Sequence, residues 1–341
     1  MIKTLRTWLR RTATLRDVPG PVESFAFGAL SLGLVAALWW WLTRGETGQR
    51  LLDAYTLPSL RETVYSLPSL WFERELSISA VTSLARVLGG FLGAAAVAVP
   101  LGVIAGSYLR VHAFLKPVSL FGRNVPVAAL IPLTLIWFGL GEVQKVMFIF
   151  LATVCFVLFD TTTAVQAVPD RFLDTARTLG VHGTPRKGAR LALRFAFAYG
   201  LAAVFGWFLL NGDGTSHTLM EELTRPACWW RFAGGAILGF VLWFPIEGHQ
   251  ALRKVILPLA LPDIVNSLRL IFGLAFGYIM LAEVINAQHG LGALIIVSQR
   301  QGPREHIYLC LIVISLMAWG IDRLFLRLHR HLFPHLNPAH T

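Results

Sequence analysis

The sequence predicts an all-α integral membrane protein, and three observations lead to that fold class. Of the 341 residues, 55% are hydrophobic and only 14% are charged, and the mean hydropathy is +0.61. Soluble domains carry about 25% charged residues, so this composition indicates that lipid surrounds much of the chain. The 11 Trp and 23 Phe residues agree with this, because aromatic side chains gather at membrane interfaces. The third observation is a series of long apolar stretches.

Six apolar stretches are long enough, or nearly so, to cross a bilayer as helices. A hydrocarbon core of about 30 Å requires about 20 helical residues. The stretches cover residues 25–42, 81–106, 125–140, 145–168, 264–285 and 307–326. The third is short and contains Pro126 and Pro132, so we expect a kinked or broken helix there. Such breaks are tolerated in lipid where neighbouring helices re-satisfy the backbone.

Two further apolar stretches, 195–210 and 232–246, are marginal in length. We expect them to form a spanning hairpin, which gives eight spans in all. A re-entrant or interfacial pair is the alternative. The segment between them, 211–230, contains the Gly, Asp and Pro residues typical of a loop. Its Trp229 and Trp230 suit the boundary between headgroups and hydrocarbon.

The distribution of Lys and Arg predicts the orientation of these helices, because positive charge concentrates in cytoplasmic segments. With the N-terminus inside, the basic segments 1–24, 107–124, 171–194 and 327–341 all fall on the cytoplasmic side. The segment 43–80, with four Arg against five acids, falls outside. We therefore expect both termini in the cytoplasm. The net charge of +11 is explained by this placement, so no nucleic-acid partner is expected.

The sequence indicates neither a metal site nor a disulfide framework. Cys155, Cys228 and Cys310 lie far apart and form no CxxC pair. The basic start of the chain runs into the first apolar stretch without a small-residue cleavage site, so we expect no cleavable signal peptide.

Two short segments far apart in the chain form one split signal, DTARTLG at 174–180 and RKVILPLALPD at 253–263. The residues that carry it are Asp174, Thr175, Ala176, Gly180, Ile256, Leu257 and Pro258. They resemble the cytoplasmic coupling loop of permease subunits in ATP-binding-cassette (ABC) importers. That loop has a Glu-Ala-Ala triplet, a Gly and then an apolar-Leu-Pro; here Asp replaces Glu and Thr replaces the first Ala.

Such a loop places a short helix in a groove of the partner ATPase. A small residue such as Ala176 lets helices approach closely, and Gly180 permits a backbone turn between two helical segments. Pro258 marks the return into the bilayer, because proline is favoured where helices start.

Four longer segments resemble the nitrate, sulfonate and taurine branch of the same family. They cover residues 57–64, 82–110, 124–146 and 267–295. The resemblance implies a MetI-like ABC importer permease core of six helices. We expect this core to comprise residues 81–183 and 249–326, preceded by the membrane helix 25–42.

Residues 184–248 depart from the family pattern, because they insert an apolar hairpin into the coupling loop itself. We expect the two halves of the loop, 174–184 and 248–262, to lie next to each other with the hairpin packed beside the core. Two alternatives remain. The hairpin is an interfacial platform that docks a partner or reshapes the ATPase contact, or the coupling role has been lost or altered.

Polar residues inside the spans are candidates for a solute path. Ionisable groups there raise the insertion free energy by about 2.5–3.5 kcal/mol each, so they usually face the interior of the helix bundle. The candidates are Asn124, Asp160, Asn266, Arg269, Glu283 and Asn286. Arg269 could equally extend toward lipid phosphates, and Glu283 could pair with a neighbouring helix.

The resemblance implies a membrane subunit of an ATP-driven importer in the inner (cytoplasmic) membrane. It implies cytoplasmic ATPase subunits, a periplasmic or lipid-anchored solute-binding protein and a second permease copy as partners, besides membrane lipid, and it implies no cofactor. The solute would be a sulfonate, a nitrate-like oxyanion or a related organic molecule. No GxxxxGK[ST] motif occurs, so we expect ATP hydrolysis on a partner chain. The alternatives are a membrane enzyme using Asp160, His182 or Glu283, and a permease-like scaffold or regulator with altered coupling.

Overall fold

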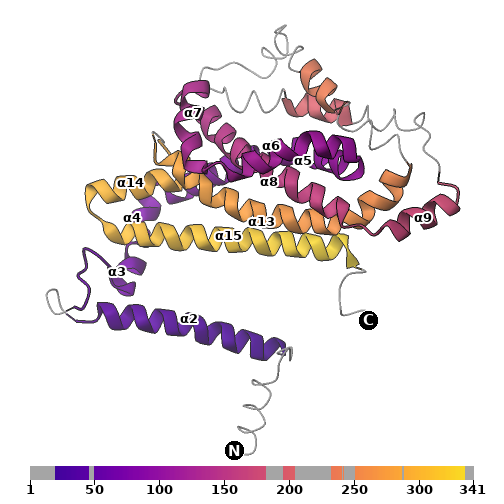
Figure 1. The fold of residues 1–341 in the computed structure, drawn as a ribbon. Coiled ribbons are helices and arrows are strands. Elements are labelled where there is room, and N and C mark those ends of the chain that lie inside the picture. Colours follow the sequence, from indigo (N-terminus) through magenta and orange to yellow (C-terminus); the bar gives the residue numbers. More distant parts are fainter. Residues whose placement is uncertain are drawn as a thin grey trace, which may run out of the picture.

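The computed structural model describes residues 20–45, 50–181, 195–203, 232–239, 241, 250–285 and 288–334. Every regular element in this part of the chain is a helix, which confirms the predicted all-α fold (Figure 1).

Five of the described helices are long and apolar enough to cross a membrane. They are α2 (Pro21–Thr43), α5 (Leu76–Ser107), α8 (Glu142–Gln166), α13 (Leu257–Glu283) and α15 (Arg304–Leu332). Four of them contain the predicted stretches 25–42, 81–106, 264–285 and 307–326 almost entirely, and α8 covers most of 145–168.

The stretch 125–140 is broken, as its two prolines predict, and it is too short to cross the bilayer on its own. It holds a short 3-10 helix, η1 (Val127–Ala129), and the nine-residue α7 (Leu130–Phe138). Nine helical residues rise only about 14 Å, which is less than half the hydrocarbon thickness. The preceding basic segment forms α6 (Leu109–Asn124). It is bent by 89° against Val127–Phe138, so the described residues contain a sixth span only if this bent pair counts as one.

The centre of the bundle is formed by α5, α8 and α13. Their buried side chains make one cluster that includes Phe91, Phe148 and Phe276. Glycines bring α5 close to α8: a Cβ added to Gly90 would lie 2.6 Å from the Cβ of Ile149. Small residues at such contacts let helix backbones approach in lipid, where packing rather than the hydrophobic effect drives association.

Different helices lie at the two ends of the bundle (Figure 1). At one end lie α9 (Asp170–Thr178), the start of α2 and the end of α15. At the other end lie α14 (Leu291–Gln301) and the short helices α3 (Leu60–Tyr65) and α4 (Leu67–Phe72). The side chains of α2 are mostly exposed, as expected for a helix surrounded by lipid.

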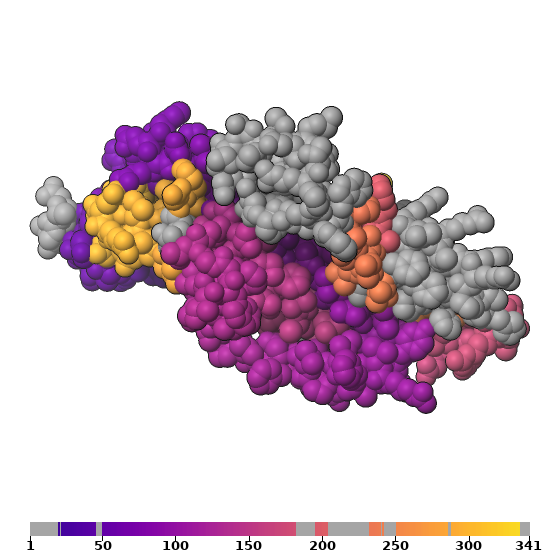
Figure 2. Space-filling view, turned by 90° about the horizontal axis from the view of Figure 1, so that it is seen from above, coloured from indigo at the N-terminus to yellow at the C-terminus, as the bar shows by residue number. Residues whose placement is uncertain are grey.

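Only two pieces of the inserted segment 184–248 belong to the described residues, apart from Val241. Residues 195–203 and 232–239 are helical and lie against each other (Figure 2). Gly235 and Gly239, four positions apart, face Tyr199, whose hydroxyl donates to the carbonyl of Ala96 in α5. Close packing through a GxxxG pair is typical of membrane helices. The turn 211–230 and its two Trp residues lie outside the described residues, so the eight-span count stays a prediction.

Candidate functional site

The helix α9 forms the first half of the split signal and ends in a well-defined cap. Asp170 occupies its first turn and Arg177 its last, which matches the charges favoured by the helix dipole. After the helix, Gly180 has a φ of +78°. Its N–H donates to the carbonyl of Arg177 at 3.0 Å, and the N–H of Val181 donates to the carbonyl of Ala176 at 3.0 Å. This is a Schellman cap, which favours glycine at the left-handed position.

The two faces of α9 differ in exposure. The side chain of Ala176 is buried, at 4% exposure. Asp174, Thr175 and Arg177 are exposed, and Arg177 pairs with Asp174 at 3.2 Å. Just past the helix, Leu179 is 78% exposed although it is apolar. Ala176 therefore faces the rest of the chain, and the opposite face of α9 is exposed.

The second half of the split signal joins α13. A π-helical turn, η3 (Leu252–Ile256), leads directly into α13, and Pro258 lies in the first turn of that helix. Ile256 is buried, Leu257 is half-buried and Pro258 is exposed.

The two halves lie next to each other. Helix α9 contacts η3, and Leu173 of α9 packs against the buried cluster that contains Leu252 and Ile256. The described parts of the loop thus form one surface at the end of the bundle, despite the inserted segment between them (Figure 1).

At the opposite end, an ion-pair network centred on the buried Arg86 and Glu283 joins three helices. The guanidinium of Arg86 in α5 donates to both carboxylate oxygens of Glu142 in α8, at 2.5 and 2.6 Å, and to Glu283 in α13 at 2.7 Å. Lys145 also donates to Glu142, at 2.9 Å. The side chains of Arg86 and Glu283 are 5% and 0% exposed. A buried carboxylate such as Glu283 requires both a counter-charge and hydrogen bonds, and this network supplies them.

The same carboxylate fixes the loop between α13 and α14. The hydroxyl of Ser83 lies 2.7 and 2.9 Å from the two oxygens of Glu283 and accepts from the N–H of Leu291 at 2.9 Å. The N–H of Gly292 donates to Glu283 at 2.9 Å. Gly290 has a φ of +136°, and a Cβ there would lie 2.5 Å from Cδ of Glu283, so the loop passes where only glycine fits.

The other predicted path residues are dispersed over the bundle rather than gathered with Glu283. Asn124 is exposed and its amide donates to the carbonyl of Leu120 at 2.8 Å. Asp160 is half-buried, and Asn266 is exposed. Arg269 forms an ion pair with Asp322 of α15 at 2.8 Å. Asn286 lies outside the described residues, as does His182.

Sequence reasoning missed the partners of Glu283. Arg86 lies within the apolar stretch 81–106. The free-energy cost of a charged group in lipid could therefore have identified Arg86 as a candidate, as it identified Glu283. Glu142 and Lys145 lie at the end of a span, where charged residues are common, so the sequence does not indicate that they pair with a buried group.

Together, the long apolar helices, the buried pair of Arg86 and Glu283 between them and the capped amphipathic helix at one end define a multi-pass membrane protein. The comparison with protein families identifies the family to which this membrane protein belongs. Residues 98–242 and 247–338, more than half of the chain, match the family described as binding-protein-dependent transport system inner membrane component, and the chain belongs to this family.

Individual relatives agree with this assignment. The taurine transport system permease protein TauC of Escherichia coli (strain K12) is 24% identical over 313 residues, covering 89% of each chain. A protein of Bacillus subtilis (strain 168) that is named as an aliphatic sulfonates transport permease protein, SsuC, is 23% identical over 305 residues. The match covers 89% of this chain and 86% of that protein. The similarity to the nitrate, sulfonate and taurine branch is thus confirmed.

A solved structure shares the fold. It is an inward-facing conformation of the MetNI methionine ABC transporter, with a TM-score of 0.51 and 15% identity, and the match covers 78% of this chain and 98% of that one. The MetI-like core is therefore confirmed.

The chain is consequently a permease subunit of an ABC importer for a small solute, and not an enzyme. Membership of this family implies a separate ATPase partner and a solute-binding protein.

Proposed function

We propose that the chain couples to its ATPase through the loop 174–184/248–262, and that the exposed face of α9 is the docking surface. In this proposal, Ala176 and Gly180 have positioning roles: the first seats α9 against η3, and the second turns the chain at its end. Asp174, Thr175 and the apolar Leu179 face the ATPase.

The observation that carries this proposal is the amphipathic exposure of α9. Ala176 is 4% exposed, whereas Leu179 is 78% exposed. The predicted orientation places this end of the bundle in the cytoplasm, outside the lipid. An exposed leucine beside charged groups fits the apolar centre and polar rim of a protein–protein contact. The contact of α9 with η3 supports the view that the insertion leaves the two halves of the loop together.

We further propose an inner-membrane location with both termini in the cytoplasm, and a second copy of the chain as partner. The start of α2, the helix α9 and the end of α15 lie at one end of the bundle, as this orientation requires (Figure 1). For the solute, we propose a small organic anion such as a sulfonate, because two relatives carry the names of taurine and aliphatic sulfonate permeases.

Co-purification with the partner ATPase tests the coupling proposal. The unaltered chain should retain the ATPase, and Leu179→Ser should weaken the complex. Burying a leucine contributes roughly 1.5–3 kcal/mol, so we expect about a tenfold or greater loss of affinity. Leu109→Ser is the matched control, because Leu109 is 77% exposed but begins α6 rather than ending α9.

Equal binding by the two serine variants would contradict the docking surface on α9. If the correctly folded, unaltered chain does not retain the ATPase at all, the insertion has changed the coupling role.

A further inference from the structure

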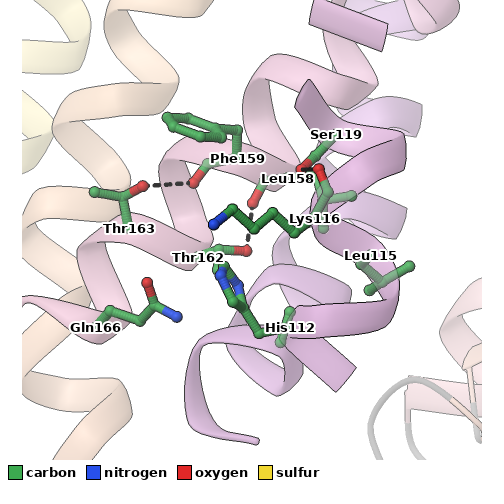
Figure 3. Close-up of a pocket in the computed structure, with 10 residues that line it drawn as sticks. His112, Leu115, Lys116, Ser119, Leu158, Phe159, Thr162, Thr163 and Gln166 are labelled. Atoms are coloured by element: carbon green, nitrogen blue, oxygen red, sulfur yellow. Dashed lines mark hydrogen bonds between the residues drawn. The ribbon is translucent and has the colours of Figure 1, made fainter. Parts of the chain in front are cut away.

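A cavity of about 200 Å³ lies between α6 and α8, beside Ala105 of α5. Six of its ten lining residues are polar, namely His112, Lys116, Ser119, Thr162, Thr163 and Gln166 (Figure 3). Pockets for drug-sized ligands occupy roughly 300–1,000 Å³, so this one suits a smaller chemical group.

Helical periodicity explains why polar groups converge here. His112, Lys116 and Ser119 are spaced by four and three residues, which places them on one face of α6. Thr162 and Gln166 are likewise four residues apart on α8. Figure 3 shows Lys116 and His112 extending from α6 toward these α8 side chains.

The hydroxyl groups of the cavity are already used as donors. Thr162 donates to the carbonyl of Leu158 at 2.7 Å, and Thr163 donates to that of Phe159 at 3.0 Å. Ser119 donates to the carbonyl of Lys116 at 3.1 Å. The donors that remain are therefore N–H groups rather than O–H groups.

The side chains of Lys116 and His112 have no hydrogen-bond or ion-pair partner among the residues that the structure describes; only their backbone groups are hydrogen-bonded. The ammonium group of Lys116 offers three donors and no acceptor, and the amide of Gln166 offers two more donors. The ten lining residues include no acid. Asp160 lies on α8 close by in sequence but does not line the cavity.

We propose that this cavity is a binding site for a single oxyanion group, of the sulfonate or phosphate type. A positive, donor-rich cavity of this size is complementary to such a group, which is small and accepts hydrogen bonds only. Two sources share that chemistry: a small free oxyanion, such as a transported solute leaving the protein, and the phosphate of an anionic lipid. The site does not depend on the proposed ATPase contact.

Melting temperatures of the purified, delipidated chain in a neutral detergent test the site. One arm adds sodium sulfate against sodium chloride at equal ionic strength. The other adds dioleoyl phosphatidylglycerol against dioleoylglycerol, which has the same chains without the phosphate. We expect stabilisation in at least one arm, by sulfate if a free oxyanion fits and by phosphatidylglycerol alone if the headgroup is the ligand.

Variants decide whether the effect belongs to this cavity. Lys116→Gln removes a charge-assisted hydrogen bond and should raise the anion concentration needed for half of the stabilisation by about tenfold or more. Lys116→Arg should retain the stabilisation. Arg110→Gln is the matched control, because Arg110 is an exposed cation on α6 that does not line the cavity. The proposal is overturned if neither anion stabilises the chain, or if Lys116→Gln responds as the unaltered chain does.

Discussion

Removing the guanidinium of Arg86 should destabilise the bundle far more than removing a surface arginine. Arg86 donates to two carboxylates and to the carbonyl of His289, at distances of 2.5 to 2.7 Å. In Arg86→Gln, the carboxylate of Glu283 stays buried at 0% exposure without its counter-charge. Removing one partner of a buried ion pair typically lowers the free energy of unfolding by about 3–5 kcal/mol.

Arg177→Gln is the matched control for this prediction. Arg177 pairs with Asp174 at 3.2 Å, and the two side chains are 71% and 67% exposed. Ion pairs between exposed side chains contribute about 0–1 kcal/mol, so this variant should differ little from the unaltered chain.

Reversible unfolding of the chain in detergent micelles measures both effects. A double-mutant cycle with Glu283→Gln adds the pairwise term, because Arg86→Gln should cost less once the buried charge of Glu283 is gone. We expect a coupling of about 0.5–3 kcal/mol between the two sites. Equal losses of stability in Arg86→Gln and Arg177→Gln, or a cycle without coupling, would refute the electrostatic account of this network.

Three further substitutions test local features. Gly290→Ala should lower the melting temperature, since its Cβ would lie 2.5 Å from Cδ of Glu283. Gly277→Ala, inside α13 with open space around it, should not lower the melting temperature, and an equal response of the two variants would contradict the close approach. Gly180→Ala should speed amide hydrogen exchange at the end of α9, because a non-glycine residue at φ +78° costs roughly 1–2 kcal/mol, and unchanged exchange would argue against the cap. Arg50 pairs with Glu62 at 2.9 Å, and this hydrogen bond lowers the pKa of Glu62 from 4.5 to about 2. The ion pair therefore stabilises the fold above pH 4.5, and this stabilisation is lost as the pH falls toward 2. Melting temperatures of Glu62→Gln and the unaltered chain should converge over that range, and a constant difference would contradict the ion pair.

Hydropathy predicted most of the spans, because helices in lipid must be apolar over the thickness of the bilayer. It failed at α6, where Arg110, Lys116 and Arg123 gave the segment the composition of a cytoplasmic loop. The structure forms a helix there, with Ser119 buried and the cations at its surface or beside α8. A mean composition cannot distinguish an amphipathic helix from a loop, whereas the spacing of individual residues could have.

The candidate site was predictable in part. The residue types at Ala176 and Gly180 indicated close packing and a turn, and the structure has a buried side chain at the first and a left-handed glycine at the second. The network around Glu283 was not predictable as a set, because Arg86, Glu142 and Glu283 are brought together only by the packing of three helices. The cavity between α6 and α8 was missed for the same reason.

The most direct test of the central claim is ATP-driven uptake in proteoliposomes. These would contain the chain with its ATPase and its solute-binding protein, and a labelled sulfonate such as taurine would be the solute. We predict uptake that requires ATP and the binding protein, and that is abolished by Ala176→Asp although this variant still inserts into the membrane. Normal uptake by Ala176→Asp would contradict coupling through α9.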